Sequence, residues 1–175
     1  MDECVQSSGH QIRKGRDLVK NPPAVTRLEI RFQDLDPYGH VNNAVYLEFF
    51  EMIRIAYWRA LASLAGIGEL EAGDIPGARY VIAETTVHYK APIFFEDTLH
   101  GAASIPTVGN CSYTIDFELR TGETFEEGLV VAEGYAAQVF FDPETDEVIP
   151  RPDWFLPAVA KLEGKSEEFF VPEEG

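Results

Sequence analysis

The most regular feature of the chain is a series of segments in which apolar and polar residues alternate. Over residues 24–32 most of the apolar positions are every second residue, which is typical of a half-buried strand. Similar patterns predict further strands over residues 79–90, 98–105, 111–120 and 129–141. Residues that favour turns separate these segments. The sequence therefore predicts five strands.

A long apolar segment lies between the first two predicted strands. Asn42 is a suitable N-cap for a helix that ends near Gly66. A helix with so narrow a polar sector must be covered by other structure. One antiparallel sheet that curls around this central helix accommodates every segment, so we expect an α+β fold. The charged residues of the helical segment are Glu48, Glu51, Arg54 and Arg59.

The length of 175 residues fits one domain. We expect a polar N-terminal tail over residues 1–23, the folded domain over residues 24–155, and a C-terminal helix or acidic tail over residues 156–175. A short helix is expected to begin near Asp153. Because an open sheet leaves an edge of unpaired backbone groups, we also expect pairing with further copies, as a homodimer or homotetramer.

The net charge of −16 narrows the range of partners. It argues against nucleic acid, because no basic surface is available to release phosphate counterions. No run of about 18 apolar residues is present, so no membrane span is expected. The N-terminus lacks the apolar run of a signal peptide, and Cys4 and Cys111 do not make a disulfide framework. Together these features favour a reducing, cytoplasmic location.

The turn before the predicted helix contains residues that suit acyl-transfer chemistry. Asp34 and Asp36 both lie in this turn, and a carboxylate there could attack a carbonyl carbon or take a proton from water. The first N–H groups of the helix have no intrahelical partner and lie at the positive end of the helix dipole, so they could bind the developing oxyanion. Alternatively, either Asp merely caps the turn. These arguments do not choose between the two.

The run Asp-Leu-Asp-Pro-Tyr-Gly-His-Val-Asn-Asn-Ala-Val-Tyr, residues 34–46, resembles the active-site motif of the 4-hydroxybenzoyl-CoA thioesterase family. Residues 87–99 resemble the second strand and turn of that family, and the likeness extends over residues 24–155. The resemblance implies a hotdog fold, in which an antiparallel sheet of about five strands wraps around a long central helix. It also implies hydrolysis of acyl-CoA thioesters to free acid and coenzyme A, with no cofactor beyond the coenzyme A of the substrate.

The resemblance also assigns roles to residues around the turn. It implies that Asp36, rather than Asp34, is the nucleophile or general base. It implies that the backbone N–H of Asn43 polarises the thioester carbonyl. His40 is expected to orient Asp36 or to contact substrate; the alternative is that it satisfies loop carbonyl groups.

Four further residues are candidates for substrate binding. Tyr46 and Phe50 could line the acyl pocket, although packing in the core explains them more simply. Asn42 lies beside the expected site but is interpreted mainly as a helix cap. Lys90 is the first candidate for the coenzyme A phosphates, with a solvated lysine as the alternative. The other candidate cations are Arg54, Arg59, Arg79 and His88.

Other interpretations of these residues remain open. No cluster of His and carboxylates has ligand spacing, so we expect no metal site. Glu51 and Arg54 can pair across the helix surface, and Glu48 and Glu51 are therefore interpreted as structural or interface residues. Because a fold does not determine function, a hydratase or dehydratase and a non-catalytic module that binds acyl thioesters are the alternatives. A binding module would not need Asp36 in front of a free helix N-terminus.

Overall fold

The computed structural model describes residues 22–67, 79–142 and 144–171. Nearly all of the predicted N-terminal tail therefore lies outside the described residues. In chain order the elements are β1 (Ala24–Leu28), the 3-10 helix η1 (Phe32–Asp34), α1 (Val45–Ala65), β2 (Arg79–Tyr89), β3 (Leu99–Val108), β4 (Ser112–Thr121), β5 (Leu129–Asp142), β6 (Glu147–Val148), α2 (Phe155–Glu163) and the 3-10 helix η2 (Glu167–Phe169).

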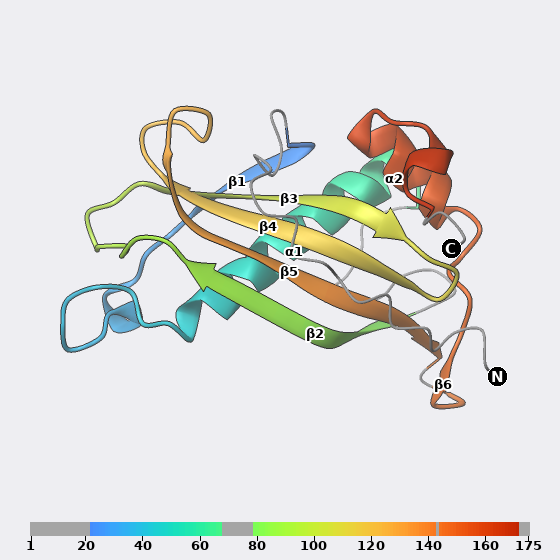
Figure 1. The fold of residues 1–175 in the computed structure, drawn as a ribbon, viewed down its shortest axis with the longest axis horizontal. Helices are drawn as coiled ribbons and strands as arrows, with labels where there is room; N and C mark the ends of the chain where they lie inside the picture. The colour runs from blue at the N-terminus through green and yellow to red at the C-terminus, as the bar shows by residue number, and fades with distance from the viewer. Residues whose placement is uncertain (1–21, 68–78, 143, 172–175) are drawn as a thin grey trace.

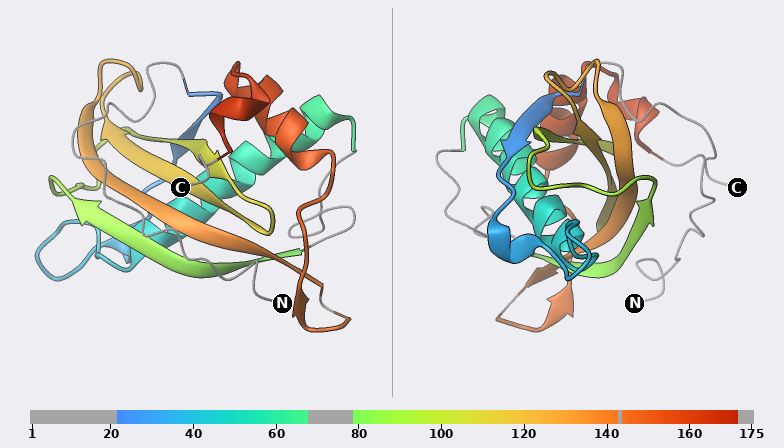
Figure 2. Two further views of the ribbon diagram at one scale, coloured as in Figure 1. Left: turned by 45° about the vertical axis from the view of Figure 1, so that its right-hand side comes forward. Right: turned by 90° about the vertical axis from the view of Figure 1, so that its left-hand side faces the viewer.

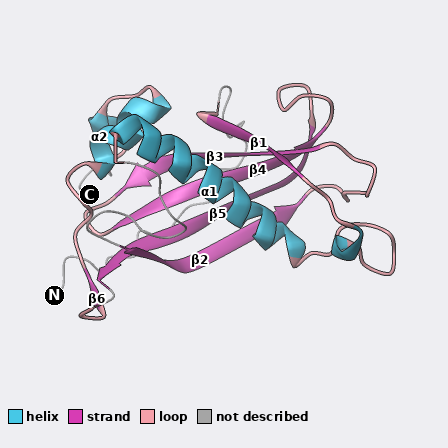
Figure 3. Cartoon of the chain, turned by 180° about the vertical axis from the view of Figure 1, so that it is seen from behind, coloured by secondary structure: helices cyan, strands magenta, loops and turns pink. Residues whose placement is uncertain are grey.

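All of the described strands belong to one antiparallel sheet. Their order is β1-β3-β4-β5-β2, and the short β6 pairs with the end of β5. The helix α1, which is 21 residues long, runs across one face of the sheet (Figures 1 and 3). The sheet curves toward this helix (Figure 2). The prediction of a single antiparallel sheet is confirmed.

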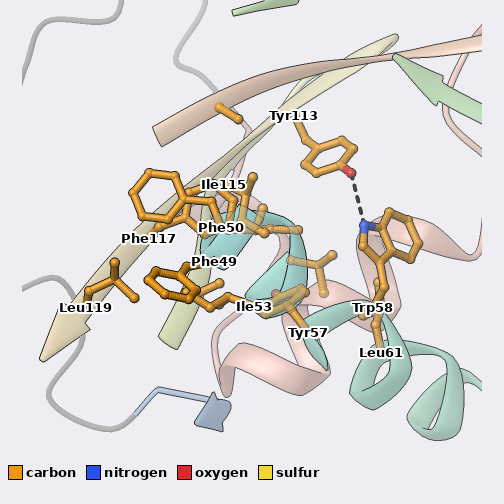
Figure 4. Packing of buried hydrophobic residues seen from close by; sticks show 14 of the residues in the cluster. Phe49, Phe50, Ile53, Tyr57, Trp58, Leu61, Tyr113, Ile115, Phe117 and Leu119 are labelled. Atoms are coloured by element: carbon orange, nitrogen blue, oxygen red, sulfur yellow. Dashed lines mark hydrogen bonds between the residues drawn. The ribbon is translucent and has the colours of Figure 1, made fainter. Parts of the chain in front are cut away.

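The core lies between α1 and the sheet. Alternate residues of β4 are buried, as the alternation over residues 111–120 predicts. Figure 4 shows these side chains facing the inner side of α1. The residues of this layer are Tyr113, Ile115, Phe117 and Leu119 from β4, and Phe49, Phe50, Ile53, Tyr57, Trp58 and Leu61 from α1.

The helix packs closely against the sheet at Gly134 of β5. A Cβ atom at this position would lie 2.5 Å from Cε2 of Phe50 and 2.3 Å from the carbonyl oxygen of Thr86. No side chain fits there, so glycine is required. The ring of Phe50 also stacks on Phe117 of β4, with ring centroids 4.5 Å apart.

The start of α1 differs from the prediction, whereas its end agrees. The helix begins at Val45, and Ala44 occupies the N-cap without a side-chain hydrogen bond. Asn42 instead forms a turn before the helix: its Oδ1 accepts a hydrogen bond from the N–H of Ala44 at 3.0 Å. The helix ends at Gly66 as predicted, in the left-handed conformation with φ 68°.

Two strands also differ from the alternation pattern. β1 ends at Leu28, and the chain then turns into η1, so Phe32 is 80% exposed instead of facing the core. In β2 the register shifts between Ile82 and Glu84, which leaves Ala83 without a cross-strand partner. Such a bulge moves the following side chains to the opposite face, and alternation alone does not locate it.

The outer side of α1 is exposed within the part of the chain that the structure describes. Leu47 and Met52 are exposed there, whereas Arg54, which we expected in the polar sector, is buried. The guanidinium of Arg54 pairs with Glu51 and lies over the ring of Tyr80, 5.6 Å from its centroid. Within the described residues, the sheet covers one side of this helix, as expected, while Leu47 and Met52 remain exposed.

Two observations bear on the expected cellular setting. Within the described ranges, no helix is long and apolar enough to cross a membrane. Cys111 is buried and is not a free cysteine, while Cys4 lies outside the described residues. The cysteines therefore do not support the expected reducing environment.

A buried carboxylate attaches α2 to the rest of the fold. Glu163, at the end of α2, accepts hydrogen bonds from the hydroxyl groups of Tyr57 and Ser104 at 2.8 and 2.9 Å. It also accepts one from the N–H of Ile105 at 2.8 Å. Burial, followed by the charge of Glu163, raises the pKa of Tyr57 well above its usual value. Because Tyr57 belongs to α1 and the other donors to β3, one side chain joins three elements.

We expect Glu163→Ala to lower the free energy of unfolding by about 2–4 kcal/mol, because buried donors would lose their acceptor. Urea unfolding followed by circular dichroism measures this loss. Glu163→Gln keeps one acceptor oxygen and should lose about half as much. Equal stability of wild type and Glu163→Ala would show that this carboxylate does not hold α2.

Candidate functional site

The segment between η1 and α1 forms a tight turn. An antiparallel bridge joins Leu35 to Val41 at its base. Inside the turn, the N–H of Asp36 donates to the carbonyl oxygen of His40 at 2.9 Å, and the N–H of Gly39 donates to the carbonyl oxygen of Asp36 at 3.0 Å. Gly39 has φ 85°, which glycine adopts without strain. These bonds fix the backbone of Asp36 shortly before the start of α1.

The carboxylate of Asp36 is partly buried, with 16% of its side chain exposed. Its Oδ1 accepts a hydrogen bond from the N–H of Tyr38 at 2.8 Å, so the side chain does cap the turn. Its Oδ2 lies 3.2 Å from Nδ1 of His40. The structure thus brings together two of the predicted site residues as a carboxylate and an imidazole, a pair that can hold and move a proton.

The start of α1 offers a free backbone donor. Among the residues that the structure describes, none accepts a hydrogen bond from the N–H of Asn43. The next N–H, that of Ala44, is occupied by Oδ1 of Asn42. The carbonyl oxygen of Asn43 accepts a hydrogen bond from the hydroxyl of Tyr89 at 3.1 Å. An unpaired N–H at the positive end of a helix suits a developing oxyanion.

Asp34 has a different environment from Asp36. It is 1% exposed, and its carboxylate accepts hydrogen bonds from the backbone N–H, Nε and Nη2 of Arg31 at 2.8, 2.9 and 2.7 Å. Burial, the largest single influence, raises the pKa of Asp34, but the hydrogen bonds and charge of Arg31 together lower it below its usual value. Because the Asp34 carboxylate is already hydrogen-bonded to Arg31, the geometry favours Asp36 as the reactive acid.

Tyr46 and Phe50 are both buried in the core. The ring of Tyr46 meets Tyr89 edge-on, with centroids 4.8 Å apart, and Phe50 stacks on Phe117. Within the described residues, packing in the core accounts for the placement of both side chains. A role for either side chain in substrate binding stays a prediction.

Two of the candidate cations, Lys90 and Arg54, form ion pairs within the protein. Lys90 follows β2 and forms an ion pair with Glu133, with Nζ 2.9 Å from Oε2. Arg54 pairs with Glu51. Coenzyme A phosphates would therefore compete with Glu133 for Lys90. In the described ranges, no group of three His, Cys, Asp or Glu side chains that could hold a metal ion is found.

Two residues beside the turn were not identified from the sequence. Tyr89 contacts both Asn43 and Tyr46, and the only signal in the sequence was its position in the predicted strand over residues 79–90. Arg31 lies at a polar position of the predicted strand over residues 24–32, but it binds Asp34 instead. Arg31 and Asp34 carry opposite charges three residues apart in the sequence. This is only a weak signal of a contact, because such spacing indicates contact mainly in helices.

Comparisons with known proteins identify the family and the fold of the chain. A sequence model of the thioesterase-like superfamily matches residues 30–159. The long-chain acyl-CoA thioesterase FadM of Escherichia coli is 29% identical over 124 residues, which are 71% of this chain and 87% of FadM. A thioesterase of Thermus thermophilus, solved with coenzyme A and Zn, is 26% identical with a TM-score of 0.65, covering 83% of this chain and 98% of that one. A DHNA-CoA thioesterase of Staphylococcus aureus is 20% identical with a TM-score of 0.65, covering 81% and 91%, and shows the fold alone.

We expect the stability of the protein to decrease in alkali partly through Tyr46. Burial, with a smaller effect of Tyr89, raises the pKa of Tyr46 to about 12, whereas an unfolded tyrosine has a pKa of about 10. The contribution of the buried, protonated Tyr46 hydroxyl to the stability of the folded protein is complete below about pH 10. This contribution is lost as the pH rises toward 12. Tyr46→Phe should therefore gain stability relative to wild type between these values, by less than about 1 kcal/mol per pH unit after solvent screening.

Chemical unfolding at a series of pH values measures this difference. Tyr38→Phe, at an exposed position in the turn, is the matched control and should follow the wild type. A constant difference between wild type and Tyr46→Phe from pH 8 to 12 would show that the Tyr46 hydroxyl ionises as freely in the folded protein as in the unfolded chain.

Proposed function

The chain belongs to the thioesterase-like superfamily, and we propose that it is an acyl-CoA thioesterase, which hydrolyses acyl-CoA thioesters to the free acid and coenzyme A. The observation that carries this proposal is the carboxylate of Asp36, beside His40, in a turn directly before a helix, together with the N–H of Asn43, from which no described residue accepts a hydrogen bond. The names of two relatives, a long-chain acyl-CoA thioesterase and a thioesterase complexed with coenzyme A, support the substrate class. The motif over residues 34–46 supports a closer placement with the 4-hydroxybenzoyl-CoA thioesterases.

In the proposed reaction, the thioester carbonyl oxygen accepts a hydrogen bond from the N–H of Asn43 at the positive end of α1. Asp36 either attacks the carbonyl carbon, giving a mixed anhydride that water cleaves, or takes a proton from the water that attacks. In both routes the C–S bond breaks and the sulfur leaves with a proton as the thiol of coenzyme A. His40 orients Asp36 and shares in the proton transfer. The reaction uses no cofactor beyond the coenzyme A of the substrate.

The remaining predicted residues have supporting roles in this proposal. Asn42 holds the start of α1 through the N–H of Ala44, which leaves the N–H of Asn43 as the free donor. Tyr46 and Phe50 form the buried wall behind the helix start. Lys90 follows Tyr89 directly and is proposed to contact the coenzyme A phosphates after releasing Glu133. From the sequence alone, we also propose a cytoplasmic location.

We expect the purified protein to release thiol from acyl-CoA thioesters, and Asp36→Ala to lower kcat by about 100-fold or more. A colorimetric thiol assay on short, long and aromatic acyl-CoA thioesters measures both rates. The matched control is Asp142→Ala. Asp142 accepts a hydrogen bond from the N–H two residues later, as Asp36 does. However, Asp142 ends β5 beside the start of β2, whereas the candidate site lies beside Tyr89 at the end of β2. Loss of the Asp142 carboxylate should leave kcat unchanged.

The possible outcomes separate the functions considered above. Absence of thiol release across the whole panel contradicts the enzyme and leaves a binding module with the same fold. Full activity of Asp36→Ala contradicts the proposed role of its carboxylate while keeping the activity. An equal loss in Asp36→Ala and Asp142→Ala would mean that turn capping, rather than chemistry, explains the effect.

We further propose that the protein forms a homodimer, or a tetramer built from such dimers, through β2. Among the described strands, none pairs with the outer edge of β2. Val81 and Ile82 of this strand are 44% and 46% exposed. A long open edge with exposed apolar side chains is a template for strand pairing. A second copy placed antiparallel about a twofold axis would close the edge on both subunits.

We expect wild-type protein to show at least twice the monomer mass in size-exclusion chromatography with light scattering. Ile82→Lys should shift it toward the monomer, because each subunit would place a charge in the paired edge. Leu129→Lys, at an exposed apolar position that begins β5, is the control and should keep the wild-type mass. A monomeric wild type at micromolar concentration would contradict the assembly.

A further inference from the structure

Three charged side chains connect the turn of Asp36 with the first turn of α1. Nη2 of Arg31 donates hydrogen bonds to Oδ1 of Asp34 and to Oε2 of Glu48, both at 2.7 Å. Asp34 lies two residues before Asp36, and Glu48 lies in the first turn of α1. One guanidinium therefore joins the segment that carries the reactive carboxylate to the helix that begins just after the Asn43 N–H.

The backbone strengthens this connection. The carbonyl oxygen of Asp34 accepts a hydrogen bond from the N–H of Asn42 at 2.8 Å, just before the helix. The N–H of Arg31 donates to Oδ2 of Asp34 at 2.8 Å. Asp34 is thus bonded through its carboxylate on one side and through its carbonyl group on the other. Because it is buried, water does not replace these partners, and its position is fixed.

We propose that Arg31, Asp34 and Glu48 are positioning residues, which hold the Asp36 carboxylate at a fixed place relative to the N–H of Asn43. This inference rests on the proposed thioesterase function. The nucleophile or base, Asp36, and the oxyanion donor, Asn43, lie at opposite ends of the connection between η1 and α1, and the rate depends on their relative placement. A displacement of about 1 Å can cost about 100-fold in rate. Substrate binding depends less on this placement. Loss of the contacts among Arg31, Asp34 and Glu48 should therefore affect kcat much more than KM.

Glu51 provides an internal comparison. Like Glu48 it is an acidic residue in the N-terminal half of α1, and it also pairs with an arginine. Its partner, Arg54, lies three residues later on the same helix, so this ion pair does not join α1 to the turn. Loss of the Glu51 carboxylate should therefore leave the position of Asp36 unchanged.

The experiment compares Asp34→Asn, Glu48→Gln, the double variant and Glu51→Gln by steady-state kinetics on the best acyl-CoA substrate of the wild type. We expect Asp34→Asn to lower kcat about 10- to 100-fold and Glu48→Gln about 3- to 10-fold, with KM within about 3-fold. Because both act through Arg31, the double variant should lose no more than Asp34→Asn alone. Glu51→Gln should keep the wild-type kcat.

Glu48 keeps the test decisive if Asp34→Asn does not fold. Its side chain is 61% exposed, so Glu48→Gln and the charge-reversed Glu48→Lys should leave the thermal melting curve nearly unchanged. Glu48→Lys places a cation against Arg31 and should lower kcat further than Glu48→Gln. Arg31→Lys cannot form the same forked contact with two carboxylates and should behave like Asp34→Asn.

The outcomes distinguish this inference from the proposed function. An active wild type with normal kcat in Asp34→Asn and in both Glu48 variants overturns the positioning role and leaves the thioesterase intact. Losses of kcat that multiply in the double variant also overturn it, since they show that the two residues act separately. Losses that appear mainly as a higher KM overturn it too, since they show an effect on substrate binding. If the wild type releases no thiol while folded, the proposed function fails and the positioning role fails with it.

Discussion

The close packing of α1 against the sheet is the constraint on which the rest of the structure depends. A Cβ atom at Gly101 would lie 2.4 Å from Cδ1 of Ile53, and one at Gly134 would lie 2.5 Å from Cε2 of Phe50. Two strands therefore present no side chain where the helix side chains reach them. Side chains in a close-packed interior cannot shift far without clashing with their neighbours. The middle of α1 is fixed in this way, and the position of its N-terminus follows.

A fixed helix N-terminus is useful for chemistry only if a reactive group stays beside it. The turn that carries Asp36 meets this requirement because it is bonded to several elements at once. The N–H of Val41 donates to the carbonyl oxygen of Ile93 at 2.8 Å, and an antiparallel bridge joins His40 to Phe94. The turn is thus attached to the loop between β2 and β3 as well as to α1. A short exposed segment acquires a defined position from its surroundings.

The parts of the fold that depend on local sequence were predictable. The alternation in β4 and the left-handed Gly66 at the end of α1 follow from residue type and spacing, and the structure has both. Strands β3 and β5 were also placed correctly, apart from a few residues at their ends. In these elements one face is buried along its whole length, so the sequence pattern and the structure coincide.

The parts that depend on contacts between distant segments were not predictable. The bulge after Ile82 changes which side chains of β2 face the core, although the sequence pattern continues through it. Arg54 is buried because Glu51 and Tyr80 surround its guanidinium, which a helical wheel does not show. At the candidate site, the motif indicated the turn, but the environments that distinguish Asp34 from Asp36 depend on Arg31. Such pairings become visible only when the chain is folded.

β2 belongs both to the candidate site and to the open edge of the sheet. At its end, Tyr89 donates a hydrogen bond to the carbonyl oxygen of Asn43 and packs against Tyr46. Along its outer edge, Val81 and Ile82 are exposed. A strand that is bonded along one edge only is less restrained than one bonded along both. If a second copy pairs with β2, it restrains Tyr89 and, through it, the start of α1, so the proposed assembly and the proposed chemistry depend on the same strand.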